Sequence, residues 1–103
     1  MTDPSVAGER LRRKLEQSAE IAGCTLDVVT GDSRDLSVSI FTCAQHWLTV
    51  IVGGDNARWW LDQLDEHSVC VPGYVLAQLA IGAIEEKDGQ LLAEIEAQTA
   101  KEA

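Results

Sequence analysis

The sequence predicts an α+β domain, in which an N-terminal helix precedes a three-stranded antiparallel meander sheet and two to three further helices pack on that sheet. Apolar residues recur every three to four positions near the N-terminus, and they alternate with polar residues over much of residues 25–52. These are the periods of a helix and of a strand. The chain has 103 residues, of which 46% are hydrophobic and 24% are charged, so we expect one folded domain over residues 1–103.

The first helix is expected to begin at Pro4 and Ser5 and to end at Gly23, because proline favours the first turn of a helix and glycine the position after the last one. Between these signals, small and apolar side chains recur at helical spacing, at Val6, Leu11, Leu15, Ser18, Ala19 and Ala22. This face should dock on the sheet, while the arginine and lysine side chains of the helix stay in water.

Three short strands are expected in residues 25–28, 35–43 and 46–52, with turns at residues 30–34 and 44–46. Pairing about the second turn sets Ile40 against Val50 and Val38 against Val52. The first turn places Leu26 and Val28 beside Val38 and Leu36, and this makes one face aliphatic across the three strands. The same alternation gathers a second apolar group on the opposite face, formed by Phe41, Cys43, Trp47 and Ile51.

A small sheet needs only one apolar face for its own core. The second face must therefore be covered by the C-terminal helix of the same chain, by a second copy, or by a target protein.

A second helix is expected over residues 57–66, after the cap formed by residues 53–56. At 100° per residue its inner arc carries Ala57, Trp60, Leu61 and Leu64. Trp59 falls on the polar side of this helix, and Asp62, Gln63 and Glu66 share that side.

Residues 69–71 suggest a short edge strand, and the turn at Pro72 and Gly73 leads into a third helix over residues 74–87 that is apolar on all sides. This helix is either sandwiched by its own chain or forms the interface of a homodimer, the commonest kind of assembly. The candidate interface residues are Leu76, Leu79, Ala80, Ala83 and Ile84. A weaker amphipathic helix is expected over residues 90–103.

The charge is strongly acidic, with 17 acidic and 8 basic residues and a net charge of −9. Residues 1–14 carry +2 and the remainder carries −11. The negative charge of residues 15–103 repels phosphates, so direct nucleic-acid binding is not expected. A protein partner with a basic surface fits better. The alternative is that the negative charge only keeps the protein soluble.

The cysteines and the terminal sequence predict a cytoplasmic protein that does not enter a membrane. Three cysteines at scattered positions fit reduced thiols better than a disulfide framework. The N-terminus does not resemble a signal peptide, and the longest apolar run, residues 69–84, is short and interrupted.

No motif indicates catalysis, and we expect neither an enzyme nor a cofactor. No serine lies in a nucleophile elbow, and Gly53 and Gly54 lack the Lys-Ser/Thr pair of a phosphate-binding loop. One metal pattern has to be weighed, because Cys43, His46, His67 and Cys70 form a C-x2-H and H-x2-C arrangement with ligand types suited to zinc. Since this order is not a common zinc-finger pattern and both cysteines fit apolar surroundings, we expect no metal.

A protein-binding role is therefore predicted, with aromatic anchors rimmed by carboxylates. The candidate partner-binding residues are Trp59, Asp62, Glu66, Phe41, Trp47 and Ile51. The leading hypothesis is a small acidic inhibitor of the anti-defence, anti-CRISPR-like kind that phages and mobile elements carry against host complexes. In such an inhibitor, acidic groups occupy a site built for nucleic acid.

Two alternatives remain open. The expected order of helix, three strands, helix, short strand and helix resembles that of acidic dimeric chaperones of secretion systems, which implies a chaperone or an immunity protein. The third hypothesis is a zinc-binding or nucleic-acid-binding regulator that uses the basic residues 10–14 as its contact.

Overall fold

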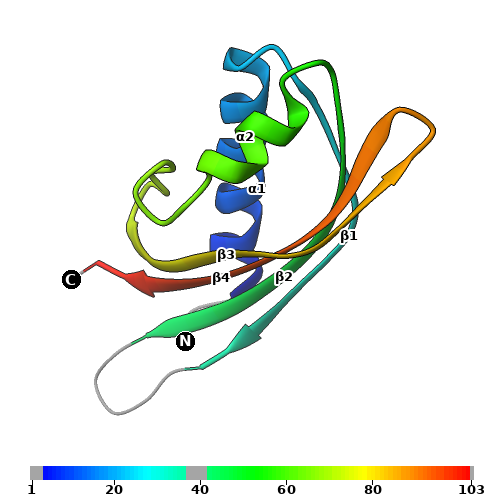
Figure 1. The fold of residues 1–103 in the computed structure, drawn as a ribbon. Coiled ribbons are helices and arrows are strands. Elements are labelled where there is room, and N and C mark those ends of the chain that lie inside the picture. The colour runs from blue at the N-terminus through cyan, green and yellow to red at the C-terminus, as the bar shows by residue number, and fades with distance from the viewer. Residues whose placement is uncertain (1–3, 37–41, 103) are drawn as a thin grey trace.

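The computed structural model describes residues 4–36 and 42–102, which form two helices and four strands (Figure 1). In chain order these are α1 (Pro4–Ile21), β1 (Thr25–Asp35), β2 (Cys43–Gly53), α2 (Ala57–Gln63), β3 (Tyr74–Lys87) and β4 (Gln90–Lys101). The predicted α+β class and the N-terminal helix are confirmed. The predicted three-stranded sheet is wrong, because the sheet has four strands.

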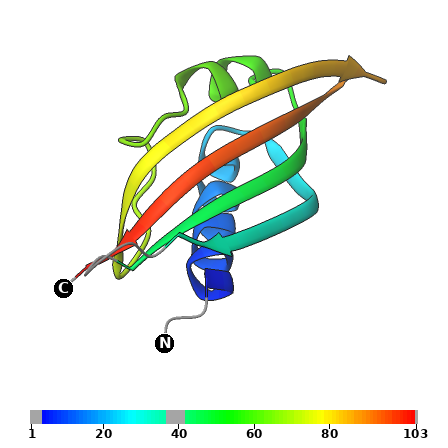
Figure 2. The same ribbon diagram turned by 90° about the horizontal axis from the view of Figure 1, so that it is seen from below.

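The four strands form one antiparallel sheet in the order β1-β2-β4-β3. Both helices lie on the same face of this sheet (Figures 1 and 2). We call this face the inner face and the opposite one the outer face. In the part of the chain that the structure describes, no helix covers the outer face.

The core lies between the inner face and the two helices. Leu11, Leu15 and Ala19 of α1 are buried there, as their helical spacing predicts, whereas Val6 is exposed. Alternate residues of the two central strands supply the sheet side of the core, with Leu48, Val50 and Val52 in β2 and Leu91, Ala93, Ile95 and Ala97 in β4. The predicted inner arc of the second helix is confirmed, because Ala57, Trp60, Leu61 and Leu64 are all buried.

β1 extends beyond the strand expected at residues 25–28, β2 extends beyond the one expected at residues 46–52, and both predicted turns are wrong. Of the strand expected at residues 35–43, residues 37–41 lie outside the described residues, Asp35 ends β1 and Cys43 begins β2. Residues 30–34 lie inside β1 and residues 44–46 lie inside β2. Leu26 lies opposite Val52 and Val28 opposite Val50, so the expected partners of these valines are replaced; the expected partners Val38 and Ile40 lie outside the described residues. The polar residues after Val28 continue the strand beyond a bulge between Val28 and Thr30, where one face is open to water.

Residues 74–87 and 90–101 form a β-hairpin, so the two helices predicted there are wrong. Asp88 and Gly89 connect the strands with φ angles of 53° and 77°, the left-handed conformation that a two-residue hairpin turn requires. The candidate dimer residues named above therefore lie on a strand, β3, at the edge of the sheet. Packing against the inner face decided this outcome, because alternate residues of β4 are buried.

Two smaller expectations also differ from the structure. The second helix ends at Gln63 rather than at residue 66. Residues 69–71 are not a strand but a loop, in which Val69 and Val71 are buried against the core. Among the described residues, neither helix is long and apolar enough to cross a membrane.

Candidate functional site

Two rows of side chains on the outer face of the sheet place carboxylates beside apolar residues. Directly opposite residues of an antiparallel sheet lie on one face, so each row can be followed across the four strands. The first row runs through Asp32, Trp47, Glu96 and Ala80, and the second through Asp27, Ile51, Leu92 and Glu85. In the first row Trp47 lies between Asp32 and Glu96, and in the second Ile51 and Leu92 lie between Asp27 and Glu85. The row of Thr30, Thr49 and Glu94 lies between these two rows.

Trp47 is held in a fixed orientation at the centre of its row. Its indole Nε1 donates a hydrogen bond of 2.8 Å to Glu96 Oε1. The guanidinium carbon of Arg34 lies 5.8 Å from the centroid of the Trp47 ring, within the range of a cation–π contact. Trp47 is half-buried, so part of an oriented aromatic surface is open to a partner.

The outer face is acidic overall. Its carboxylates are Asp27, Asp32, Glu85, Glu94 and Glu96, and the register places only two basic residues, Arg34 and Lys87, among them. Glu94 and Glu96 are two residues apart on β4, which separates them by about 7 Å along the strand. This face combines exposed negative charge with a patch of apolar side chains.

The predicted partner-binding residues fall on two separate surfaces. Trp47 and Ile51 share the outer face, as the alternation of β2 predicts, together with Cys43. Phe41 lies outside the described residues. The carboxylates of β4 were missed, although they alternate with buried Ala93, Ile95 and Ala97, and this alternation is the signal that could have revealed them.

The other predicted binding residues lie at α2, on the helix side of the sheet. Trp59 is 62% exposed, and Asp62 forms an exposed ion pair of 3.7 Å with Arg58. Glu66 follows the end of the helix, in a turn that the side chain of Asp65 stabilises. The backbone N–H of His67 donates a 2.8 Å hydrogen bond to Asp65 Oδ1, and this bond lowers the pKa of the Asp65 carboxyl.

The four residues weighed as zinc ligands are not brought together. His46 is fully buried on the inner face, whereas the side chain of His67 is 85% exposed and Cys70 is exposed in the loop after α2. Within residues 4–36 and 42–102, no group of three or more histidine, cysteine or acidic side chains has an arrangement that could hold a metal ion.

His46 instead forms a polar bridge between three strands. Its Nδ1 lies 2.7 Å from Ser33 Oγ in β1, and its Nε2 lies 2.9 Å from Thr99 Oγ1 in β4. A neutral imidazole donates through one nitrogen and accepts through the other, so both hydroxyl groups can be satisfied. His46 Nε2 faces the neutral hydroxyl of Thr99 and not a carboxylate. A protonated His46 would therefore gain little stabilisation from its neighbours. We interpret it as a structural bridge.

Protonation of His46 should destabilise the fold. Burial lowers the pKa of His46 below 6.5, its ordinary value. As the pH falls through 6.5, the unfolded chain therefore binds a proton that the folded chain does not, and the free energy of unfolding decreases by at most about 1.4 kcal/mol per pH unit for this one proton. Urea denaturation at a series of pH values from about 7.5 to about 5.5 measures this slope.

The exposed histidine supplies the control for this pH dependence. The variant His67→Gln should keep the slope, since His46 is unchanged in it. A flat profile, or a slope that disappears with His67→Gln, would show that His46 is not the group responsible.

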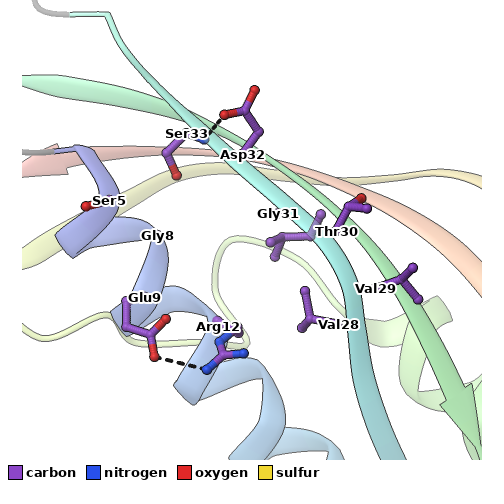
Figure 3. A pocket seen from close by; sticks show the side chains of 11 residues that line it. Ser5, Gly8, Glu9, Arg12, Val28, Val29, Thr30, Gly31, Asp32 and Ser33 are labelled. Carbon is purple, nitrogen blue, oxygen red and sulfur yellow. Dashed lines mark hydrogen bonds and ion pairs between the residues drawn. The ribbon is translucent and has the colours of Figure 1, made fainter.

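A groove of about 540 Å³ lies between α1 and β1, and Ser33, the partner of His46, is one of the residues that line it (Figure 3). Val28 and Leu48 contribute its apolar part. On the helix side, Arg12 donates a 3.1 Å hydrogen bond to Glu9, and on the strand side the carboxylate of Asp32 accepts a 3.0 Å hydrogen bond from the backbone N–H of Ser33. Figure 3 marks these two hydrogen bonds with dashed lines.

Two of the four basic residues of α1 are paired with carboxylates of the same helix. Arg12 lies 3.1 Å from Glu9 and 3.5 Å from Glu16, and Arg13 lies 3.6 Å from Glu9. Arg10 and Lys14 hydrogen-bond to the Pro72 carbonyl and to Gln17, so two basic side chains stand against five carboxylates on the outer face, which is the stronger candidate site. No protein-family model, curated protein or solved structure matches this chain.

Proposed function

We propose that this protein is a non-enzymatic binding module, whose outer sheet face binds a protein with a basic surface. The observation that carries the proposal is the side chain of Trp47, which Glu96 and Arg34 orient on a sheet face that also carries Asp32 and Glu94. Aromatic residues are enriched among interface hot spots, and complementary charge around them fixes the orientation of a partner.

The class of partner follows from the chemistry of this face. A line of carboxylates beside an aromatic ring suits a surface rich in arginine and lysine, which is the kind of surface that binds nucleic acid. Such a partner would be blocked while the acidic face occupies its site. The protein would therefore act as an acidic inhibitor, of the anti-defence kind directed against nucleic-acid-binding host complexes, and the net charge of −9 is consistent with this role.

The alternative functions receive less support from the geometry. The resemblance to secretion chaperones depended on an order of three strands between two helices, whereas the chain has two strands before α2 and two after it. A nucleic-acid-binding regulator would need a larger set of free basic groups, because Arg12 and Arg13 are paired with carboxylates of α1, which leaves Arg10 and Lys14 of the predicted contact. No second function is proposed.

Affinity capture with matched variants tests the proposal. The immobilised protein is exposed to an extract of its native host, and retained proteins are identified by mass spectrometry. We expect a nucleic-acid-binding protein that is released by salt and by competing double-stranded DNA, because the Debye length falls to about 3 Å at 1 M salt. The double variant Asp27→Lys with Glu94→Lys should lose it.

The control is an equal change of charge on the other surface. The double variant Asp62→Lys with Glu66→Lys alters the surface at α2 and should retain the partner. The proposal would be contradicted if the partner were still retained after the charge reversal on the outer face. It would also be contradicted if only the α2 variant lost the partner. Insensitivity to competing DNA would contradict occupation of a nucleic-acid site.

A further inference from the structure

Most of the β3 edge lacks the charged residues that protect a sheet edge, and its only irregularities among the described residues are two bulges, between Leu76 and Gln78 and between Ile81 and Ile84. β1 and β3 are the two edge strands, and β1 carries four charged residues, Asp27, Asp32, Arg34 and Asp35. β3 carries none over residues 74–84, where Val75 is 53% exposed. Charged residues on an edge strand oppose pairing with another chain, so β1 is protected and most of β3 is open to it.

The side chains of β3 are arranged symmetrically about Ala80. Moving outward from Ala80, Leu79 and Ile81 both lie on the inner face, as do Leu76 and Ile84. Farther out, Val75 and Glu85 are equally distant from Ala80 and both lie on the outer face. Tyr74 and Glu86 are also equally distant from Ala80, and both lie on the inner face. The register shifts also fall on both sides, between Leu76 and Gln78 and between Ile81 and Ile84.

This symmetry fits pairing with an identical strand. In an antiparallel pair, directly opposite residues must lie on the same face. If a second copy pairs through its β3 about a two-fold axis at Ala80, each of these residues meets a residue of its own face. A shift by one position would set inner-face residues against outer-face residues.

Charge at the ends of the strand favours the same pairing. Arg10 lies at the Tyr74 end, where its Nη1 donates a 3.1 Å hydrogen bond to the Pro72 carbonyl and its guanidinium carbon is 5.7 Å from the Tyr74 ring centroid. Among the described residues, Arg10 forms no ion pair, unlike Arg12 and Arg13. Pairing about Ala80 places Glu86 of the second copy opposite Tyr74, and therefore near Arg10.

We propose that two copies of this chain associate through their β3 edges, about a two-fold axis at Ala80, to form one continuous eight-stranded sheet. The inference does not depend on the proposed function. In this homodimer the exposed apolar edges of the two β3 strands pair with each other. Arg10 of each copy contacts Glu86 of the other, which gives two symmetric contacts. The outer faces of the two copies would then form one continuous acidic surface.

A charge swap tests this arrangement without disturbing the core. Sedimentation equilibrium of the full chain should show a dimer, and Arg10→Glu and Glu86→Arg should each weaken the dimer by about tenfold or more, since each reverses both symmetric contacts. The double variant Arg10→Glu with Glu86→Arg should recover most of the loss. Glu20→Arg, on the exposed part of α1, is the control and should leave the dissociation constant unchanged.

A second variant tests the position of the axis. Ala80→Lys places two lysines opposite each other and should convert the dimer to a monomer with unchanged circular dichroism. A wild-type chain that stays monomeric at about 1 mM would overturn the proposal. A dimer that tolerates Ala80→Lys, or a double charge variant weaker than both single ones, would overturn it as well.

Discussion

Replacement of Trp60 by alanine should lower the free energy of unfolding by about 3–5 kcal/mol, the range for deleting a large buried aromatic side chain. Trp60 is 1% exposed in the core between α2 and the sheet. Its Nε1 also donates a 2.9 Å hydrogen bond to Ser18 Oγ, which joins α2 to α1. The truncation therefore removes apolar contacts and leaves the hydroxyl of Ser18 without this partner.

The neighbouring tryptophan is the matched control. Trp59→Ala removes the same side chain at an exposed position and should change the free energy of unfolding by less than about 0.5 kcal/mol. Trp60→Phe, which keeps most of the apolar volume, should fall between the two. Urea denaturation followed by circular dichroism measures all three variants. Equal losses for Trp59→Ala and Trp60→Ala would mean that α2 packs on the core in a different rotation.

Trp47→Ala should weaken partner binding by about 30-fold or more, which corresponds to a hot spot of about 2 kcal/mol. The variant removes the oriented ring and leaves Arg34 and Glu96 without their common contact. Fluorescence anisotropy with the captured partner measures the dissociation constant. Trp59→Ala should bind as the wild type does.

Stability has to be separated from binding in this comparison. Trp47 is half-buried, so its truncation also removes some packing within the sheet. Thr49→Lys provides an independent change on the same face, because Thr49 lies beside Glu94 in the register. Both variants should weaken binding while each keeps the circular dichroism spectrum of the folded protein. If Trp59→Ala abolishes binding and Trp47→Ala does not, the binding surface lies at α2.

The sequence predicted those elements whose periodicity is undisturbed. In α1 and α2, helical spacing identified the buried Leu15 and Trp60 and the exposed Trp59. In β2, strict alternation placed Trp47 and Ile51 on one face and Val50 on the other. These patterns are local, and each reports which side of an element faces the core.

The second hairpin was missed because two local signals opposed the strand assignment. In β3, register shifts near residue 77 and residues 82–83 break the period of two, so a strand with alanine on its exposed face looks apolar on all sides. In β4, alternation is regular, but leucine, alanine, glutamate and glutamine are strong helix formers. Pairing of Ile95 with Leu48 and Ile81 overrides this preference, and such contacts between distant residues cannot be read from a local pattern.

The candidate site depends on the same distant contacts. The row from Asp32 to Ala80 joins four strands, and Glu96 is 49 residues from Trp47 in the sequence although their side chains form a hydrogen bond. Only the register of β4 brings its carboxylates beside the aromatic ring. The alternation of β2 therefore indicated an apolar outer face, whereas its acidic character became visible with the fold.

The most direct test of a binding surface on the outer face is an NMR titration of the isotope-labelled protein with its captured partner. The account predicts that the largest amide shift changes and losses of intensity occur in β2 and β4, around Trp47, Ile51 and Glu94. Residues 57–66 and the exposed side of α1 should change little. Changes concentrated at α2 around Trp59, with β2 and β4 unaffected, would contradict the account.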